Sequence, residues 1–278
     1  MGARGDQLRH HVPGWHLPAL VALVVVLVSL SVAQAGASYV TASFASVRIG
    51  ATVQNRPLEV SCVGTGSQTV LIVGGIHTGM EAITSTLAQE IADVARTGEL
   101  AVPSAIRLCV LPMLNVDGIA LAQRTNANAV DLNRNWPGAD WQATAFHSGP
   151  VGAGAQPLSE PEARALYDYI LGKHPDIVLV LHCCGALVEA NEAPEASHMA
   201  RVYAAGASLT YIEEWKAYPI TGQFIDSMQE RGIPAIDIEM SRRDETDFAA
   251  HRAGVVALVY YLATQTPVGY AGGAPTLP

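Results

Sequence analysis

Short apolar runs alternate with more polar segments between about residues 45 and 263. The apolar runs are rich in valine, isoleucine and leucine, a composition that favours β-strands. They are VRIGATV, LEVSCVG, TVLIVGG, IRLCVLPML, DIVLVLHCC and PAIDIEM. A run as continuous as IVLVL is typical of a strand that is buried on both faces. The pattern therefore predicts an α/β fold in which helices cover both faces of a sheet.

Helices are expected between most of these strands. The expected helices span about residues 80–97, 159–173, 193–209, 221–232 and 245–263. The second begins at Ser159-Glu160-Pro161-Glu162, where serine is a good N-cap, proline suits the first turn and Glu162 can complete a capping box. No internal repeat occurs between residues 40 and 265, so a single domain is expected.

The two ends of the chain differ in composition from this region. Arg4 and Arg9 precede an apolar run from Leu17 to Val32 and the tripeptide Ala33-Gln34-Ala35. This order is typical of a signal peptide, and an uncleaved membrane anchor is the alternative. Residues 266–278 are rich in glycine and proline. We expect a signal peptide or anchor at 1–35, a domain at 36–265 and a flexible tail at 266–278, in a protein that is secreted or periplasmic.

Charge and cysteine content narrow the class of protein further. The chain of 278 residues is half apolar and carries a formal net charge of −9 at pH 7. This acidic balance does not suit nucleic acid. The four cysteines lack the CxxC spacing of a zinc ribbon. Cys62 and Cys109 lie in strand-like runs, where they could form a disulfide in an oxidising compartment or be two small buried side chains.

Polar side chains stand where three apolar strands end. His77 follows TVLIVGGI, His182 follows DIVLVL and Glu239 follows PAIDI. In α/β sheets, ligands bind at the carboxyl ends of strands. Together with Glu81, the two histidines would form a two-histidine, one-carboxylate set, which is typical of catalytic zinc and leaves a coordination position open for water. Glu81 taken alone could also be favoured by the dipole of the helix that follows it.

The segment RTNANAVDLNRNWP, residues 124–137, is unusually polar for its place between apolar strands. Arginine next to asparagine suits a carboxylate ligand, which a guanidinium can hold through two hydrogen bonds. The motifs GGIH…E, VDLNRNWP, LH after a strand and IE after a late strand occur in that order. Together they resemble the zinc metallocarboxypeptidase family of carboxypeptidase A type, especially its short bacterial members without a pro-domain. The resemblance spans about residues 45–263.

This resemblance implies a fold, a metal and a mechanism. The fold would be a single zinc carboxypeptidase-like catalytic domain, with a mixed, twisted sheet of about eight strands flanked by helices on both faces. One Zn²⁺ per chain would be held by His77, Glu81 and His182. Glu239 would be the general base that, together with the metal, activates the attacking water. Asp131 would orient the first histidine.

The resemblance also implies how a substrate is held. Asn133 and Arg134 would bind its terminal carboxylate, and Arg124 would polarise the scissile carbonyl. Tyr218 matches a tyrosine that folds over the bound substrate, with a surface aromatic side chain in a loop as the alternative. Ile225 matches the floor of the side-chain pocket, which would favour an apolar terminal residue.

One spacing differs from the family pattern. Three residues separate His77 from Glu81, whereas the usual motif has two, so the turn between them must bulge. Gly79 can absorb the extra residue because glycine adopts backbone angles that other residues resist.

The leading functional expectation is an exported metallocarboxypeptidase that hydrolyses peptide bonds next to a free C-terminal carboxylate. The alternatives among hydrolases are a murein peptide amidase that cleaves a diaminopimelate-containing bond and a deacylase of N-acyl amino acids. A different class follows if the extra residue misplaces Glu81, namely a catalytically weak peptide-binding protein. The expected partner is a peptide or murein peptide with a free carboxylate, with a membrane added only if the N-terminal segment stays uncleaved.

Overall fold

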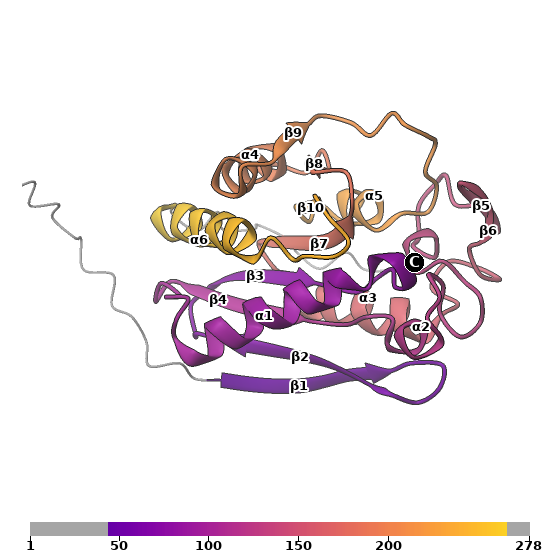
Figure 1. Ribbon diagram of the computed structural model, residues 1–278, viewed down its shortest axis with the longest axis horizontal. Coiled ribbons are helices and arrows are strands. Elements are labelled where there is room, and N and C mark those ends of the chain that lie inside the picture. Colours follow the sequence, from indigo (N-terminus) through magenta and orange to yellow (C-terminus); the bar gives the residue numbers. More distant parts are fainter. Residues whose placement is uncertain (1–43, 266–278) are drawn as a thin grey trace, which may run out of the picture. The chain divides into compact units, whose positions relative to one another are not determined.

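A computed structural model of the protein describes residues 44–265 (Figure 1). The predictions for residues 1–35 and 266–278 fall outside this described part of the chain. Within residues 44–265, no helix is long and apolar enough to cross a bilayer.

The centre of the fold is an eight-stranded sheet. Its strands are β1 (Phe44–Ala51), β2 (Pro57–Val63), β3 (Gln68–Val73), β4 (Ile106–Leu111), β7 (Ile177–Cys183), β8 (Leu187–Ala190), β9 (Thr210–Ile212) and β10 (Ala235–Met240). They lie in the order β1-β2-β4-β3-β7-β10-β8-β9. The four central strands β4, β3, β7 and β10 run parallel, whereas β1, β2 and β8 pair antiparallel with their inner neighbours. The predicted mixed sheet is confirmed.

Helices cover both faces of this sheet, as predicted. The helices are α1 (Ile83–Thr97), α2 (Val116–Leu121), α3 (Pro161–Lys173), α4 (Ala196–Ala207), α5 (Phe224–Gln229) and α6 (Phe248–Thr264). The alternation of side chains along β3 divides the core, because Ile72 belongs to the apolar cluster that includes α1, α4 and α6, while its neighbour Leu71 belongs to the cluster that includes α3 and α5. A two-stranded hairpin, β5 (Thr144–His147) and β6 (Gly149–Gly152), lies outside the main sheet.

The start of α3 differs from the sequence prediction. The helix does begin at Pro161, but its N-cap is Glu160, and no side chain caps it. Glu162 accepts hydrogen bonds from the backbone N–H of Val53 and from the side chain of Asn126 instead of closing a capping box. A carboxylate that has distant donors within reach is therefore not free to cap its own helix.

All four cysteines are paired in disulfides. Cys62 and Cys109 are directly opposite each other on β2 and β4 and form one of them, which decides between the two alternatives that the sequence left open. The neighbours Cys183 and Cys184, at the end of β7, form the other. The first disulfide fastens the β1–β2 edge of the sheet to its parallel centre.

Candidate active site

The three predicted metal ligands lie together at the carboxyl edge of the sheet. His77 follows β3, Glu81 ends the 3-10 helix Gly79–Glu81, and His182 is near the end of β7. All three are buried, and one potential ligand atom from each lies within 4.8 Å of the others. The parallel pairing of β3 with β7 brings two residues that are 105 positions apart in the chain, His77 and His182, to the same edge.

The turn between His77 and Glu81 has the form that its extra residue requires. Gly79 has a φ of +63°, and a Cβ at this position would lie 3.3 Å from the backbone nitrogen of Arg124. The hydroxyl of Thr78 donates to the carbonyl of Gln123, which ties the turn to the next segment. Glycine is favoured here because left-handed backbone angles cost it little. The longer spacing therefore does not carry Glu81 away from the histidines.

Each of the two imidazoles has a carboxylate close to its Nε2 atom. Nε2 of His77 lies 2.8 Å from Asp131 Oδ1, and Nε2 of His182 lies 3.4 Å from Asp237 Oδ1. The Nδ1 atoms of the two rings therefore face Glu81 Oε2, at 3.3 and 3.9 Å respectively. Such carboxylates fix the ring tautomer and orientation of metal-ligating histidines. The role of Asp131 was expected, whereas Asp237 was missed.

Neighbouring charges oppose the effect of burial on the pKa of Glu81 and on that of His182. Burial alone would raise the pKa of Glu81, but His77, His182 and Arg124 lower it well below its usual value. Burial likewise would lower the pKa of His182, but the negative charge of Asp237 raises it, which makes the imidazole a stronger base. Two imidazoles and an ionised carboxylate, oriented toward one point, fit the donor set of a catalytic zinc ion.

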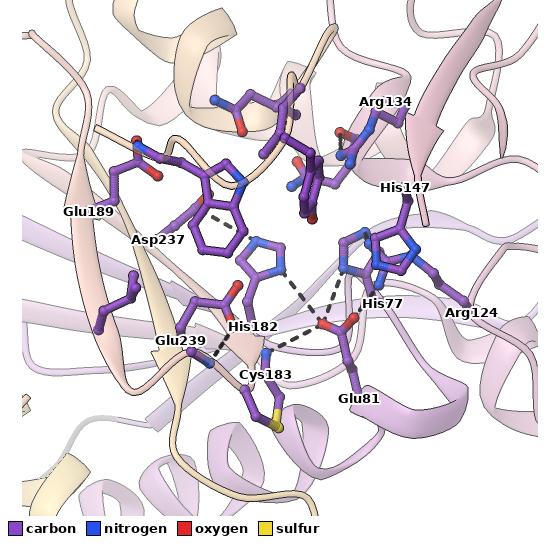
Figure 2. A pocket seen from close by; sticks show the side chains of 18 residues that line it. His77, Glu81, Arg124, Arg134, His147, His182, Cys183, Glu189, Asp237 and Glu239 are labelled. Carbon is purple, nitrogen blue, oxygen red and sulfur yellow. Dashed lines mark hydrogen bonds and ion pairs between the residues drawn. A yellow bond between two sulfur atoms is a disulfide. The ribbon is translucent and has the colours of Figure 1, made fainter. Parts of the chain in front are cut away.

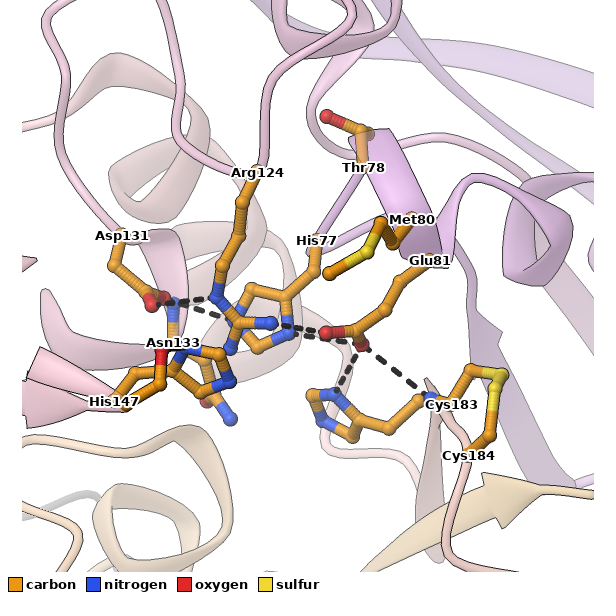
Figure 3. A network of polar contacts seen from close by, with 12 residues as sticks. His77, Thr78, Met80, Glu81, Arg124, Asp131, Asn133, His147, Cys183 and Cys184 are labelled. Atoms are coloured by element: carbon orange, nitrogen blue, oxygen red, sulfur yellow. Dashed lines mark hydrogen bonds and ion pairs between the residues drawn. A yellow bond between two sulfur atoms is a disulfide. The ribbon is translucent and has the colours of Figure 1, made fainter. Parts of the chain in front are cut away.

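Arg124 links the two carboxylates of this cluster (Figure 3). Its Nη1 donates to Glu81 Oε1, and its Nε donates to Asp131 Oδ2 at 3.0 Å. Burial would lower the pKa of Arg124, but Asp131 and Glu81 raise it. The guanidinium is thus a fixed positive charge beside the candidate ligands, at the position where the sequence predicted a group that stabilises developing negative charge.

Glu239 lies next to the candidate ligands without belonging to them. On β10 it is the register partner of His182 on β7, and its Oε2 accepts a hydrogen bond of 3.1 Å from the backbone N–H of Gly185. Burial raises its pKa, and the charge of Glu81 adds to this effect, while His182 opposes it. A carboxylate with a raised pKa is better suited to accept and return a proton near neutral pH.

The pocket that contains the candidate metal ligands is also lined by Asn133, Arg134 and Tyr218. Arg134 is held rigidly, since its Nε and Nη2 donate to the carbonyl of Phe146 and its Nη1 donates to the carbonyl of Asn133. Asn133 accepts from the backbone N–H of Phe224. The ring of Tyr218 packs against the ring of His147 at a centroid distance of 5.9 Å. These residues therefore converge on the pocket as expected.

Ile225 is not brought to the pocket. It lies in α5, is 2% exposed and belongs to the apolar cluster on the face of the sheet that α3 and α5 cover. The residues that do line the pocket include Glu189, Asp237 and Gln223. The structure thus offers no apolar floor at Ile225, and the expected preference for an apolar terminal residue loses its basis.

The fold and the cluster together define a class of protein. A His–Glu–His set at the carboxyl edge of a mixed sheet, with a separate glutamate and a buried arginine in the same pocket, is the arrangement of a zinc metallopeptidase. A sequence profile described as zinc carboxypeptidase matches residues 41–258. The chain therefore belongs to the zinc carboxypeptidase family, which confirms the resemblance found in the sequence motifs.

The sequence relatives include murein peptide amidases. Murein peptide amidase A of Escherichia coli (strain K12) is 37% identical over 97 residues, which cover 31% of this chain and 40% of the relative. Murein peptide amidase A of Vibrio campbellii is 29% identical over 141 residues, which cover 47% of this chain and 55% of the relative. The chain thus spans about half or less of the length of these relatives.

Solved structures of other proteins share this fold. Bovine thrombin-activatable fibrinolysis inhibitor superposes with a TM-score of 0.68 at 19% identity, covering 79% of this chain and 90% of that one. Murein-tripeptide amidase from Escherichia coli O157 superposes with a TM-score of 0.62 at 24% identity, covering 80% and 92%. At these identities the likeness establishes the carboxypeptidase-like fold.

Proposed function

We propose that this protein is an exported, zinc-dependent carboxypeptidase that hydrolyses the amide bond preceding a residue with a free carboxylate. One observation carries the proposal. The ligand atoms of His77, Glu81 and His182 lie within 4.8 Å of one another in a pocket that Glu239 and Arg134 also line. These are the groups needed for a metal, a proton acceptor and a carboxylate clamp in one place.

The two histidines and Glu81 would hold one zinc ion per chain. When bound, zinc polarises a carbonyl oxygen and lowers the pKa of water. Glu239 would take a proton from the attacking water at its carboxylate and pass it to the leaving amine. Asp131 and Asp237 would keep the imidazoles aligned throughout.

The clamp side of the pocket would set the position of cleavage. Arg134 and Asn133 would bind the terminal carboxylate of the substrate, so that the bond preceding the last residue lies at the metal. Arg124 would donate to the carbonyl oxygen as negative charge develops on it. Tyr218, beside His147, would cover the bound residue.

Export is inferred from the N-terminal sequence and from one disulfide. Residues 1–35 read as a signal peptide or anchor. The Cys62–Cys109 disulfide supports an oxidising location, because such bonds persist mainly outside the cytoplasm. The natural substrate would then be a peptide outside the cytoplasmic membrane.

A murein peptide is the second candidate substrate. It is favoured by the relatives, since the sequences that match this chain include murein peptide amidases. A murein peptide that ends in diaminopimelate also presents a free carboxylate next to the bond to be cut, so the same residues would serve both reactions.

Chelation should abolish the activity. We expect the purified protein to release single residues from peptides with free C-termini, or from murein peptides, and to stop when a zinc chelator is added. Added zinc should restore the reaction. Mass spectrometry of the products from a mixed peptide library and from murein peptides measures both substrate classes at once. Products that are insensitive to the chelator, or no products from either class with zinc present, would contradict the proposal.

Arg134→Ala should distinguish substrates by their terminal charge. We expect kcat/KM for peptides with a free C-terminus to fall by about 10- to 100-fold, since hydrogen bonds between charged groups are lost. C-terminally amidated versions of the same peptides should be affected little, which also reports on the integrity of the fold. The exposed Arg96, altered in the same way, provides the control. An equal loss on both kinds of substrate would remove Arg134 from the clamp.

A further inference from the structure

Two adjacent cysteines form a disulfide inside the pocket. Cys183 is the last residue of β7 and Cys184 follows it, so the pair comes directly after the candidate ligand His182. Both cysteines line the pocket, and Figure 3 shows their sulfur atoms bonded to each other. The stabilisation that a disulfide gives grows with the length of the loop it closes. A bond between neighbours joins no distant parts of the chain, so this disulfide contributes little to holding the fold together.

The other disulfide has the properties of a structural bond. Cys62 and Cys109 are 47 positions apart, join two strands and are 3% and 1% exposed. Neither is among the residues that line the pocket. Exchange requires a thiolate to reach a disulfide sulfur, so burial protects this bond. Cys184, in contrast, is only partly buried and lines the pocket. A small thiol that enters the pocket therefore reaches one disulfide and not the other.

The backbone around the adjacent pair holds two carboxylates of the site. The N–H of Cys183 donates to Oε2 of Glu81 at 3.3 Å, and the N–H of Gly185 donates to Oε2 of Glu239 at 3.1 Å. Figure 2 shows Cys183 and Glu239 in the same pocket as His182. The ring that the disulfide closes lies between these two N–H groups in the chain. The disulfide therefore restrains the backbone that positions a candidate metal ligand and the candidate proton acceptor.

The surroundings of the pair also suit its reduced form. The Sγ of Cys183 lies 3.1 Å from the carbonyl oxygen of Arg242, in the segment after β10. In the disulfide this sulfur carries no hydrogen, whereas a thiol at the same place would donate one to the carbonyl. The site therefore offers a hydrogen-bond partner to the thiol that opening of the ring creates.

We propose that Cys183 and Cys184 form a thiol–disulfide exchange site that takes small thiols and controls catalysis in the pocket, with the disulfide as the active form. The thiolate of the reagent attacks Sγ of Cys184, the bond between the two cysteines breaks, and its electron pair goes to Sγ of Cys183, which takes up a proton. A second reagent thiol attacks the reagent sulfur of this mixed disulfide and releases Cys184 as a thiol. Two reagent thiols are thus oxidised to one disulfide, and the cysteine pair gains two electrons and two protons.

Opening of the ring removes the restraint on the two N–H donors. The hydrogen bonds to Glu81 and Glu239 then lose their fixed geometry, and turnover falls. This effect on turnover rests on the proposed function, whereas the exchange itself does not. In an exported enzyme the consequence would be a catalytic site that becomes active only in an oxidising compartment.

Labelling of the folded protein tests the exchange. Zinc-loaded protein is incubated with 2-mercaptoethanol, a small thiol without a carboxylate, and free thiols are then blocked with iodoacetamide and located by mass spectrometry of peptides. We expect label on Cys183 and Cys184 and none on Cys62 and Cys109. Treatment with the disulfide of 2-mercaptoethanol before blocking should remove the label. An unlabelled adjacent pair, or equal labelling of all four cysteines, overturns the inference.

Turnover and zinc content of the same samples test the control of catalysis. We expect kcat of the labelled form to be about 10- to 100-fold lower, the usual cost of losing a group that supports a metal ligand, and to recover on reoxidation. The double variant Cys183→Ser, Cys184→Ser has no bond to exchange, so its turnover, whatever its level, should not respond to the thiol. An equal response in this variant would mean that the reagent removes zinc, and equal turnover of the reduced and oxidised wild type would mean that the pair has no control over catalysis; either result overturns the inference. If neither form cuts any peptide, the proposed function fails, and the labelling pattern still decides whether the exchange site exists.

Discussion

Glu239→Gln is expected to lower kcat by about 10²–10⁴-fold while the zinc content of the protein stays at the wild-type level. Glutamine keeps the size of the side chain and can still accept the hydrogen bond from Gly185 through its amide oxygen. It cannot take up a proton at neutral pH, so only the proton transfer is removed. The residue is outside the His–Glu–His cluster, so the metal should remain.

Zinc content by atomic emission and kcat from product release together measure this effect. Glu213→Gln is the matched control, because that side chain is 85% exposed and has no proposed role in the site. Turnover close to wild type would exclude Glu239 as the proton acceptor. Loss of zinc in this variant would instead mean that Glu239 is itself a ligand.

His182→Ala is expected to remove the metal itself. Deleting one of three ligands should weaken zinc binding by more than the roughly 10- to 100-fold that loss of a supporting partner costs, and activity should fall with occupancy. The fold should survive because the apolar run of β7 continues to pair with β3 and β10 on both sides.

Competition against a chelator of known affinity measures the change in zinc binding. His147→Ala is the control, since His147 lines the same pocket but is not in the ligand cluster. If His182→Ala keeps one zinc per chain under these conditions, the metal is held by other side chains. Equal zinc loss in both variants would indicate a general disturbance of the pocket.

The central residues of the site could be predicted because the ends of apolar strands can be recognised in a sequence. His77, His182 and Glu239 each follow an apolar run, and parallel strands bring such positions to one edge regardless of their separation in the chain. The polar segment that contains Asn133 and Arg134 was visible for the same reason, since it is too polar for its surroundings.

Some residues reach the pocket only because two short strands that are far apart in the chain pair with each other. Such residues could not be found in this way. Glu189 lies on β8, a strand of four residues, and its place in the pocket depends on its register with Asp237 on β10. A signal for Asp237 did exist, because alternation along AIDIEM places it on the same face as Glu239. Ile225 failed as a pocket residue because α5 turns it into the core rather than toward the cavity.

Glu189 enters the pocket from β8, whereas the candidate metal ligands come from the ends of β3 and β7. Strands pair through backbone atoms, so the side chain at position 189 can change without disturbing the ladder that aligns His182 with Glu239.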